Sequence, residues 1–304
     1  MNNKGLVVLS LFDGIGGGRI ALERAGIKVD KYFASEIKKQ AIKCATTNWN
    51  DIIEIGDVTK VKYEGNKLYN DQGEVIYEGH IDLLIGGSPC QDFSYASMVN
   101  GGSYGLQGTK SKLFYEYLRL KNEIKPTYFF LENVKMKQSS ERQLNHYMGV
   151  EGLHINSNLV SFQNRNRIYW TNIPNASVPE DRHIDFQDYI DTDIDRLNQA
   201  KCNRTAYRER MWNNGMGGKG LLYCSNVTNA HKVNTVTRKQ DRSPNSGLIE
   251  YDGFCRMLTR RELEDAQTLP HGYTDCLSYN QAQDVIGDGW TIDVIAHLFK
   301  GLKE

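Results

Sequence analysis

A cysteine lies where a predicted buried strand delivers the chain to an exposed loop. The apolar run at 81–85 predicts the strand, and residues 86–91 read Gly-Gly-Ser-Pro-Cys-Gln. A proline restricts the backbone just before Cys90, and the glycine pair lets another molecule approach closely. A thiol held in this way suits a nucleophile. A small buried thiol at a strand end is the alternative interpretation, because free cysteines are often buried.

A carboxylate is expected at the same edge of the fold. Residues 127–131 predict a very apolar strand, and Glu132 follows them directly. Apolar surroundings favour a protonated carboxyl group, which could serve as an acid or hydrogen-bond donor. A solvated carboxylate at a strand end is the alternative. Glu132 is therefore a candidate partner for Cys90.

Two arginines follow in a third segment. Alternation in a strand over 162–171 would place Gln163, Arg165 and Arg167 on one face. Two arginines side by side need an anion or an acceptor to satisfy them. A substrate phosphate or a base carbonyl would meet this need.

The first predicted strand, 6–12, runs into a glycine-rich turn. In a doubly wound sheet this turn is the usual cofactor position, although the sequence is not the G-x-G-x-x-G dinucleotide pattern and is a weak signal alone. Glu36 follows the second strand, where it can accept hydrogen bonds from ribose hydroxyls, and Asp57 follows the third, where it can meet an adenine amino group. Each acid alone could be a solvated carboxylate. The series of turn and two acids favours an adenosyl cofactor.

Strand-like and helix-like stretches alternate through the first 173 residues. The predicted strands are 6–12, 32–35, 52–55, 81–85, 127–131 and part of 162–171, and the predicted helices are 17–25, 37–48 and 112–123. Such βαβ alternation predicts an α/β fold with a doubly wound, mostly parallel sheet.

The alternation is lost from about residue 174, where the sequence becomes polar and rich in glycine and asparagine. Short strand-like pieces remain at 221–224 and 233–236, and helical periodicity returns at 259–269 and 291–302. We therefore expect a small irregular module inserted before the last elements of the large domain.

Charge is balanced overall but not locally. The chain has 37 basic and 37 acidic residues, so its global charge selects no partner. Residues 180–196 carry seven acidic and two basic side chains, whereas 201–242 carry nine basic and two acidic ones. The basic segment could direct a polyanion to itself, and a solvated loop is the alternative.

The cysteine spacing and the lengths of the apolar runs indicate which metal sites, disulfides and membrane spans the chain could have. The six cysteines are irregularly spaced with no C-x-x-C pair, which argues against a zinc site or a disulfide framework, and we predict no metal site. No leader is recognisable at the N-terminus, and no run approaches the roughly 18 apolar residues of a membrane span. We expect a cytoplasmic protein, bacterial or phage-encoded, with no membrane contact.

Taken together, these segments resemble the cytosine-5 DNA methyltransferase family in wording and in order. The matching segments are the F-x-G-x-G turn at 11–17, Pro-Cys-Gln at 89–91, Glu-Asn-Val at 132–134, Q-x-R-x-R at 163–167 and an arginine–threonine–glutamate motif at 256–262. The resemblance covers nearly the whole chain except about 174–250, where the family has its variable target-recognition region. Residues 287–291 read Gly-Asp-Gly-Trp-Thr, closer to the tryptophan-bearing ending of the eukaryotic de novo branch than to the Gly-Asn pair of most bacterial members.

The resemblance implies a Rossmann-like methyltransferase fold and a covalent mechanism. S-adenosylmethionine would methylate C5 of a cytosine in a specific duplex DNA sequence, leaving S-adenosylhomocysteine. Cys90 would add to C6, Glu132 would contact N3 and the exocyclic amine, and Arg165 would hold the base O2 and orient Glu132. The base must be flipped out, and Gln91 with the glycine-rich residues 94–109 would close over the site.

The resemblance also implies the remaining contacts. The predicted cofactor residues are Phe12, Asp13, Gly14, Ile15, Gly16, Gly17, Glu36, Ile37, Asp57, Val58, Pro89, Leu113, Trp290 and Thr291. The predicted DNA contacts are Arg167, Arg204, Arg208, Arg238 and Lys239, the last two as candidate base readers. Residues 1–173 would form the catalytic and cofactor-binding domain, 174–269 the target-recognition domain and hinge, and 270–304 the return to the catalytic domain.

Two other functions stay open at this point. A transfer-RNA branch of the family shares the Pro-Cys-Gln and Glu-Asn-Val chemistry, but its expected Cys-Phe-Thr signature is absent from this sequence. A catalytically idle DNA-binding relative would not need Cys90, Glu132 and Arg165 together. The expected partner is double-stranded DNA, a companion restriction endonuclease is compatible with the sequence, and a monomer is favoured.

Overall fold

The chain forms two compact units in a computed structural model that describes residues 4–88, 112–217, 226–240 and 246–303. Unit 1 comprises Met1–Ile155, Asn166–Val178 and Ile295–Glu304, and unit 2 comprises Asn156–Arg165 and Pro179–Val294. In the described part of the chain no helix is long and apolar enough to cross a membrane. The functional division at 173 and 269 stays a prediction.

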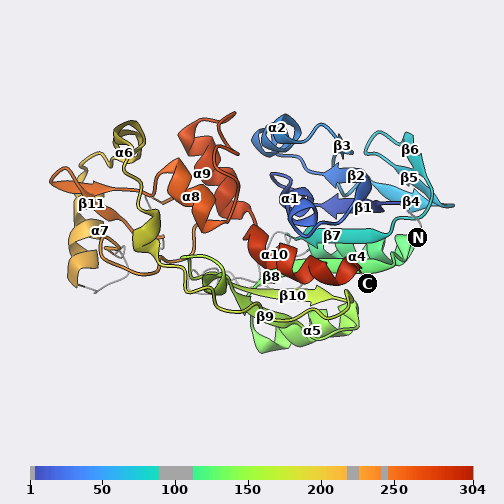
Figure 1. Cartoon of the computed structure of the whole chain (residues 1–304). Coiled ribbons are helices and arrows are strands. Elements are labelled where there is room, and N and C mark those ends of the chain that lie inside the picture. The colour runs from blue at the N-terminus through green and yellow to red at the C-terminus, as the bar shows by residue number, and fades with distance from the viewer. Residues whose placement is uncertain (1–3, 89–111, 218–225, 241–245, 304) are drawn as a thin grey trace. The chain divides into compact units, whose positions relative to one another are not determined.

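Unit 1 is built on a seven-stranded sheet in the order β3-β2-β1-β7-β8-β10-β9 (Figure 1). Its strands are β1 (Leu6–Leu11), β2 (Val29–Ser35), β3 (Ile52–Glu54), β7 (Leu83–Gly87), β8 (Tyr128–Val134), β9 (Leu153–Asn156) and β10 (Asn166–Thr171). The pairs β1–β2, β2–β3, β1–β7 and β7–β8 are parallel, and β10 is antiparallel to β8. The predicted doubly wound, mostly parallel α/β fold is confirmed.

Helices cover both faces of this sheet (Figure 1). They are α1 (Gly17–Arg24), α2 (Lys39–Asn48), α4 (Lys112–Ile124), α5 (Gln138–Met148) and α10 (Ile292–Phe299). On one face Leu9 and Trp170 belong to the same buried cluster as Tyr117 of α4. On the other face the Phe130 ring lies 5.2 Å from the ring of Phe299, which comes from α10. Strand alternation thus supplies apolar residues to both faces, as a sheet buried on two sides requires.

A second, three-stranded sheet between β3 and β7 was not expected from the sequence. It consists of β4 (Lys62–Glu64), β5 (Lys67–Tyr69) and β6 (Val75–Glu78), paired antiparallel in that order. Strands of three or four residues carry too little alternation to be recognised in a sequence. Tyr63 and Leu68 join the buried cluster of unit 1, so the hairpins extend its core.

Unit 2 contains short helices and one hairpin. The helices are α6 (Ile194–Ala200), α7 (Ala206–Gly217), α8 (Arg260–Ala266) and α9 (Tyr279–Asp288), with 3-10 turns at Ser157–Leu159 and Phe186–Tyr189, and the hairpin pairs β11 (Ile249–Tyr251) with β12 (Phe254–Arg256). The predicted strand at 221–224 lies outside the described residues. The one predicted at 233–236 is wrong, because only an isolated bridge between Gln163 and Val233 forms there.

The strand expected within 162–171 begins at Asn166. The backbone N–H of Arg165 donates to the side chain of Asn156, and the carbonyl of Arg165 accepts from the N–H of Ser157. These bonds replace a strand ladder at this position. The expectation that strand alternation places Gln163 and Arg165 on one face with Arg167 is therefore wrong.

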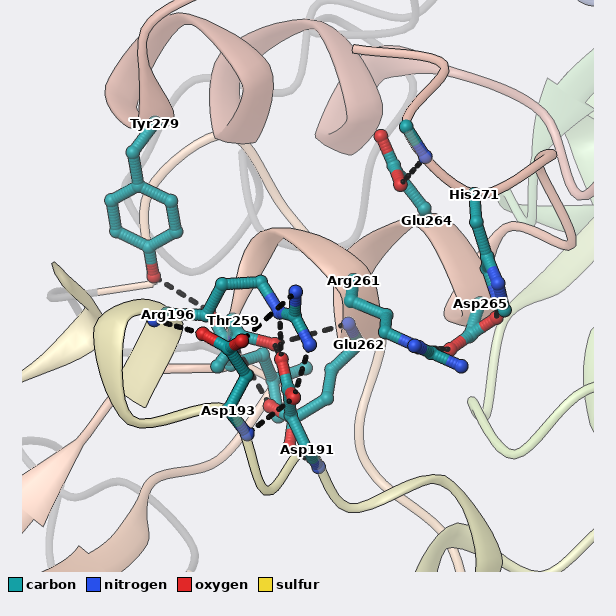
Figure 2. Close-up of polar contacts among 12 residues, drawn as sticks. Asp191, Asp193, Arg196, Thr259, Arg261, Glu262, Glu264, Asp265, His271 and Tyr279 are labelled. Carbon is teal, nitrogen blue, oxygen red and sulfur yellow. Dashed lines mark hydrogen bonds and ion pairs between the residues drawn. The ribbon is translucent and has the colours of Figure 1, made fainter. Parts of the chain in front are cut away.

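The start of α8 is held by buried polar groups. Arg256 is 2% exposed and forms two hydrogen bonds, of 2.7 and 2.8 Å, with the fully buried carboxylate of Glu262. Thr259 and Glu262 form a capping box, and the Thr259 hydroxyl donates to Asp191 at 2.8 Å (Figure 2). Burial opposes ionisation of Asp191, but hydrogen bonds from Arg196, from the backbone and from Thr259 outweigh it and hold the pKa of Asp191 well below its usual range. The arginine–threonine–glutamate motif thus builds a structural anchor.

Candidate functional site

The strand order of unit 1 reverses between β1 and β7. In a doubly wound sheet, ligands bind beyond the carboxyl ends of the strands at this switch point. The register pairs Leu11 with Gly86 and Gly87 with Glu132, so β1, β7 and β8 end at a common edge. At this edge the glycine-rich turn follows β1 and the segment that leads to Cys90 follows β7. Glu132 lies near the end of β8 at the same edge.

The chain that leads to Cys90 is held at Ser88 by a residue of β8. Pro89, Cys90 and Gln91 lie outside the described residues. Ser88, which directly precedes them, is buried, and the amide of Asn133 donates to the Ser88 hydroxyl at 3.1 Å and to its carbonyl at 3.4 Å. Sequence reasoning did not single out Asn133 as a site residue. Its place directly after Glu132 was the available signal.

Glu132 is paired with Arg167. The carboxylate is 8% exposed, and the Nε atom of Arg167 lies 2.8 Å from its Oε1 atom. Antiparallel pairing of Tyr169 with Glu132 brings the two side chains to the same end of the sheet. Arg167 was predicted as a DNA contact, whereas Arg165 was expected to orient Glu132. The structure gives Arg167 a contact that can orient this carboxylate.

Arg165 belongs to unit 2 and is 4% exposed. Its Nη1 atom donates to the Val236 carbonyl at 3.0 Å, and its Nη2 atom donates to the carbonyls of Gly289 at 2.8 Å and Gly287 at 3.5 Å. These acceptors are backbone groups of unit 2. The contacts give Arg165 a structural task within that unit.

Glu36 closes the glycine-rich turn. Its Oε2 atom accepts the N–H of Gly14 at 2.9 Å, and its Oε1 atom accepts the N–H groups of Ile37 and Lys38 at 2.8 and 2.9 Å. Gly14 has a φ of 63°, and a Cβ built on it would have no atom within 4 Å, so the turn borders open space there. The Ile37 side chain is 71% exposed although it is apolar. An apolar ligand surface could cover it.

Asp57 begins a turn after β3. Its Oδ1 atom accepts hydrogen bonds from the backbone N–H and the hydroxyl of Thr59, at 3.0 and 2.9 Å. Carboxylate acceptors at 36 and 57, an open glycine turn and an exposed isoleucine match the hydroxyls, amino group and apolar ring of an adenosyl group. The residues of unit 1 therefore fit such a cofactor.

Two acids are buried beside this turn. The Tyr32 hydroxyl donates to Oδ1 of Asp13 at 2.6 Å, whereas Oδ2 of Asp13 and both carboxyl oxygens of Glu54 are buried without a hydrogen-bond partner among the described residues. Burial raises the pKa of Asp13 to about 6. Burial, and then repulsion by Asp13 and Glu36, raises the pKa of Glu54 to about 8. Glu54 was missed by sequence reasoning, although a glutamate among the isoleucines of the predicted strand 52–55 was a signal.

The other predicted cofactor residues differ in their surroundings. Ile15 and Val58 are buried, and Leu113 is half-buried at the start of α4. Thr291 is a buried residue of unit 2 whose hydroxyl donates to Gln267 at 2.8 Å, and Trp290 is half-buried. Ile15 and Val58 lie within the core, and the assignment of all these residues to the cofactor stays a prediction.

The predicted DNA contacts of unit 2 are also engaged inside the unit. The Arg204 guanidinium lies 5.0 Å from the centre of the Phe254 ring, and Arg208 donates to the Asn203 carbonyl at 3.3 Å. Arg238 pairs with Asp284 through its Nε atom at 2.6 Å. In each case the guanidinium group makes the contact, on a side chain that is exposed in Arg204 and Arg238 and half-buried in Arg208.

A family model described as C-5 cytosine-specific DNA methylase matches residues 6–304. The chain belongs to this family. It is a DNA cytosine-5 methyltransferase with an S-adenosylmethionine-dependent methyltransferase fold, and the alternatives of a transfer-RNA enzyme and of an idle relative are not favoured.

Several curated methyltransferases are similar to this one. The type II methyltransferase M.SsoII of Shigella sonnei is 28% identical over 95% of this chain and 77% of its own length. M1.ScrFI of Lactococcus lactis subsp. cremoris, also a type II methyltransferase, is 28% identical over 98% of this chain and 78% of its own length. The orphan methyltransferase M.Rho11sI of Bacillus phage rho11s is 40% identical over 43% of this chain and 23% of its own length.

Solved methyltransferase structures share the fold. The Entamoeba histolytica methyltransferase EhMeth superposes with a TM-score of 0.72 at 16% identity, covering 99% of this chain and all of its own. The Schizosaccharomyces pombe Dnmt2 methyltransferase gives a TM-score of 0.68 at 16% identity over 98% of this chain and all of its own. At this identity the likeness concerns the fold alone.

Proposed function

We propose that this cytosine-5 methyltransferase modifies a flipped-out cytosine within a specific duplex sequence through a covalent bond to Cys90. The observation that carries the proposal is the pairing of Gly87 with Glu132 and of Glu132 with Arg167. This arrangement sets a buried, oriented carboxylate beside the strand that leads into Cys90. A reacting base placed between the thiol and the carboxylate would meet both.

The chain's own residues would carry the following chemistry. Cytosine C5 is a poor nucleophile, so the Cys90 thiolate adds to C6 and the ring gains enamine character at C5. Glu132 holds N3 and the exocyclic amine and so stabilises the adduct. Arg167 orients Glu132 and can reach the base O2, the role that the family resemblance implied for Arg165. Once C5 carries the methyl group, a solvent water takes the C5 proton, and the electrons of that C–H bond reform the C5–C6 double bond as the bond between C6 and sulfur breaks. The ring is then aromatic again and Cys90 leaves as a thiolate.

Each predicted cofactor residue would contact a different part of the adenosyl group. Glu36 would accept from the ribose hydroxyls, Asp57 from the adenine amino group, and Ile37 would cover one face of the ring. The backbone of the turn at Gly14 would approach the ligand closely. When bound, S-adenosylmethionine supplies the methyl group as an electrophile.

The partners follow from the substrate. The target atom is inaccessible inside a duplex, so the base must leave the stack at a cost of a few kcal/mol. The basic residues of 201–242 would bind phosphates, with Arg204 and Arg208 among them. Two type II methyltransferases among the relatives support a companion restriction endonuclease. We propose a monomer that acts in the cytoplasm, where bacterial DNA lies.

Replacement of the nucleophile tests the proposal. Cys90→Ser should abolish methyl transfer to duplex DNA and leave cofactor affinity nearly unchanged, because a hydroxyl is a far weaker nucleophile of similar size. Wild-type enzyme should be trapped covalently on a duplex with 5-fluorocytosine at the target, since fluorine cannot leave as a proton does. Cys276→Ser is the matched control and should stay active. Full activity of Cys90→Ser, or trapping by it, would contradict the mechanism.

A further inference from the structure

In unit 2, the side chains of Gln163 and Arg165 form hydrogen bonds with the backbone N–H and the carbonyl of Val236. The Oε1 atom of Gln163 accepts the N–H of Val236 at 3.1 Å, and the Nη1 atom of Arg165 donates to the carbonyl of Val236 at 3.0 Å. The backbone of Gln163 also pairs with that of Val233 in an isolated bridge. Val236, Gln163 and Arg165 are all buried. The Q-x-R part of the motif thus replaces a strand ladder and fixes the chain at 236.

The chain is held a second time at Gln240, four residues after Val236. Gln240 is fully buried, and its amide accepts the N–H of Leu258 at 3.0 Å and donates to the carbonyl of Leu258 at 3.3 Å. The three residues 237–239 are therefore held between two buried anchors. A span this short has little freedom once both of its ends are fixed.

The middle of the span rests on α9. A Cβ on Gly287 would clash with the backbone of Thr237 and Arg238, so only glycine allows this close approach. The Nε atom of Arg238 lies 2.6 Å from Asp284 and 3.6 Å from Asp288, both on α9. These carboxylates hold Arg238 in place. Lys239 is exposed and has no ion-pair partner among the described residues.

We propose that 237–239 is the base-reading element of this methyltransferase and that Gln163 and Arg165 are positioning residues for sequence selectivity, an inference that rests on the proposed function. Lys239 would contact the base edge, and Arg238 would brace it or share the contact. Both side chains are hydrogen-bond donors only. The base they read must offer acceptors, and in the major groove guanine offers two, N7 and O6.

A fixed element explains why buried residues would control selectivity. A side chain reads a base only if its backbone holds it at one distance from the groove, because phosphate contacts alone carry no sequence information. Arg165 holds the carbonyl of Val236, three residues before Lys239. Loss of this hydrogen bond should lower the enzyme's selectivity for its target sequence, and it removes no group that reacts with cytosine.

The experiment starts from the sequence that wild-type enzyme methylates, found by bisulfite mapping of a plasmid. For each variant, kcat and KM are measured on a duplex with this target and on duplexes with one guanine position replaced. Lys239→Ala should lower the selectivity ratio by roughly 5- to 150-fold, the range of one good base contact. Arg210→Ala removes the same charge from exposed α7 and serves as the control, with an unchanged ratio.

Arg165→Lys tests the positioning role. Lysine keeps the charge, but its three donors lie on a single nitrogen, which cannot span the three carbonyls that Arg165 binds through two nitrogens. KM on the target should therefore rise and selectivity should fall, while kcat and trapping on 5-fluorocytosine hold. Replacing the target guanine by 7-deazaguanine should reduce the difference between wild type and Lys239→Ala, because one of the two acceptors, N7, is gone while O6 remains. Loss of kcat and trapping with unchanged selectivity would overturn the proposal and give Arg165 a part in the chemistry.

Lys239→Ala keeps the proposal falsifiable if Arg165→Lys does not fold, because position 239 is exposed. An unchanged selectivity ratio in Lys239→Ala overturns the proposal. An equal loss of affinity on every duplex also overturns it, since Lys239 would then bind phosphate only. Absence of methylation or trapping by the wild type would instead refute the proposed function, so the two failures are distinguishable.

Discussion

Two arginines two residues apart serve different units. Arg167 belongs to unit 1, whose core is apolar, and it pairs with a carboxylate at the edge of the sheet. Arg165 belongs to unit 2 and binds backbone carbonyls, just as Arg256 of the same unit is buried against Glu262. In unit 1 the core is apolar and the Arg167–Glu132 pair lies at the edge of the sheet. In unit 2 the buried arginines are themselves part of the interior packing. Identical residue types in one motif therefore carry different tasks.

The strongest way to break this contrast is to remove the buried arginine of unit 2. Arg256→Ala leaves the Glu262 carboxylate buried without its cation, which costs about 3–5 kcal/mol. Chemical unfolding should show this loss of stability in unit 2. Replacing both partners by Arg256→Met and Glu262→Leu should cost much less, because no charge is left unpaired. Equal losses in the single and double variants would show that packing, and not the ion pair, holds α8.

The next largest effect is expected at the edge of unit 1. Arg167→Ala should lower kcat by about 100-fold or more, because a misplaced catalytic group can cost this much. Cofactor affinity should change little. Arg142→Ala, at an exposed position on α5, is the matched control. If Arg167→Ala changes sequence selectivity instead of kcat, the contrast between the two arginines is reversed.

Glu36 offers a sharper test of how unit 1 presents its polar groups. Glu36→Ala should weaken S-adenosylmethionine binding by roughly 1.5–3 kcal/mol, the range for a hydrogen bond to a charged group. Titration calorimetry measures the affinity directly. Glu23→Ala, on α1 and exposed, is the control. Unchanged affinity would limit Glu36 to its observed role of closing the turn at Gly14.

A further test concerns the proton on Glu54 in unit 1. Because the folded pKa of Glu54 is about 8, above its ordinary value of 4.5, the folded state keeps a proton that the unfolded chain releases. Stability should therefore fall as pH rises from about 5 to 8. Glu54→Gln should flatten this dependence, whereas Glu64→Gln, an exposed control, should not. A profile with the same slope in Glu54→Gln would place the proton elsewhere.

Much of unit 1 was predictable because long apolar strands alternate with amphipathic helices. The strands β1, β7 and β8 and the helices α1 and α4 lie close to their predicted positions. The hairpins β4–β6 were missed because strands of three or four residues show little alternation, and helix α5 was missed because few of its residues are apolar. Motif order placed Glu132 at the sheet edge.

The exchange between Arg165 and Arg167 could not be predicted in the same way. Alternation assumes a regular strand, but the strand begins only at Asn166, so the motif crosses from one unit to the other. The grip on Val236 depends on a segment some 70 residues away in sequence. Such side chain to backbone contacts leave no local pattern, which is why the structural task of Gln163 and Arg165 appears only in three dimensions.

The core of unit 1 takes residues from distant parts of the chain, and this has a consequence during synthesis. Phe299 packs on Phe130, two residues before Glu132, yet the ribosome adds it only after unit 2 is complete. Because domains fold as they emerge, N-terminal parts first, the sheet behind Glu132 stays uncovered until then. A chain interrupted before Ile295 would lack a finished catalytic unit.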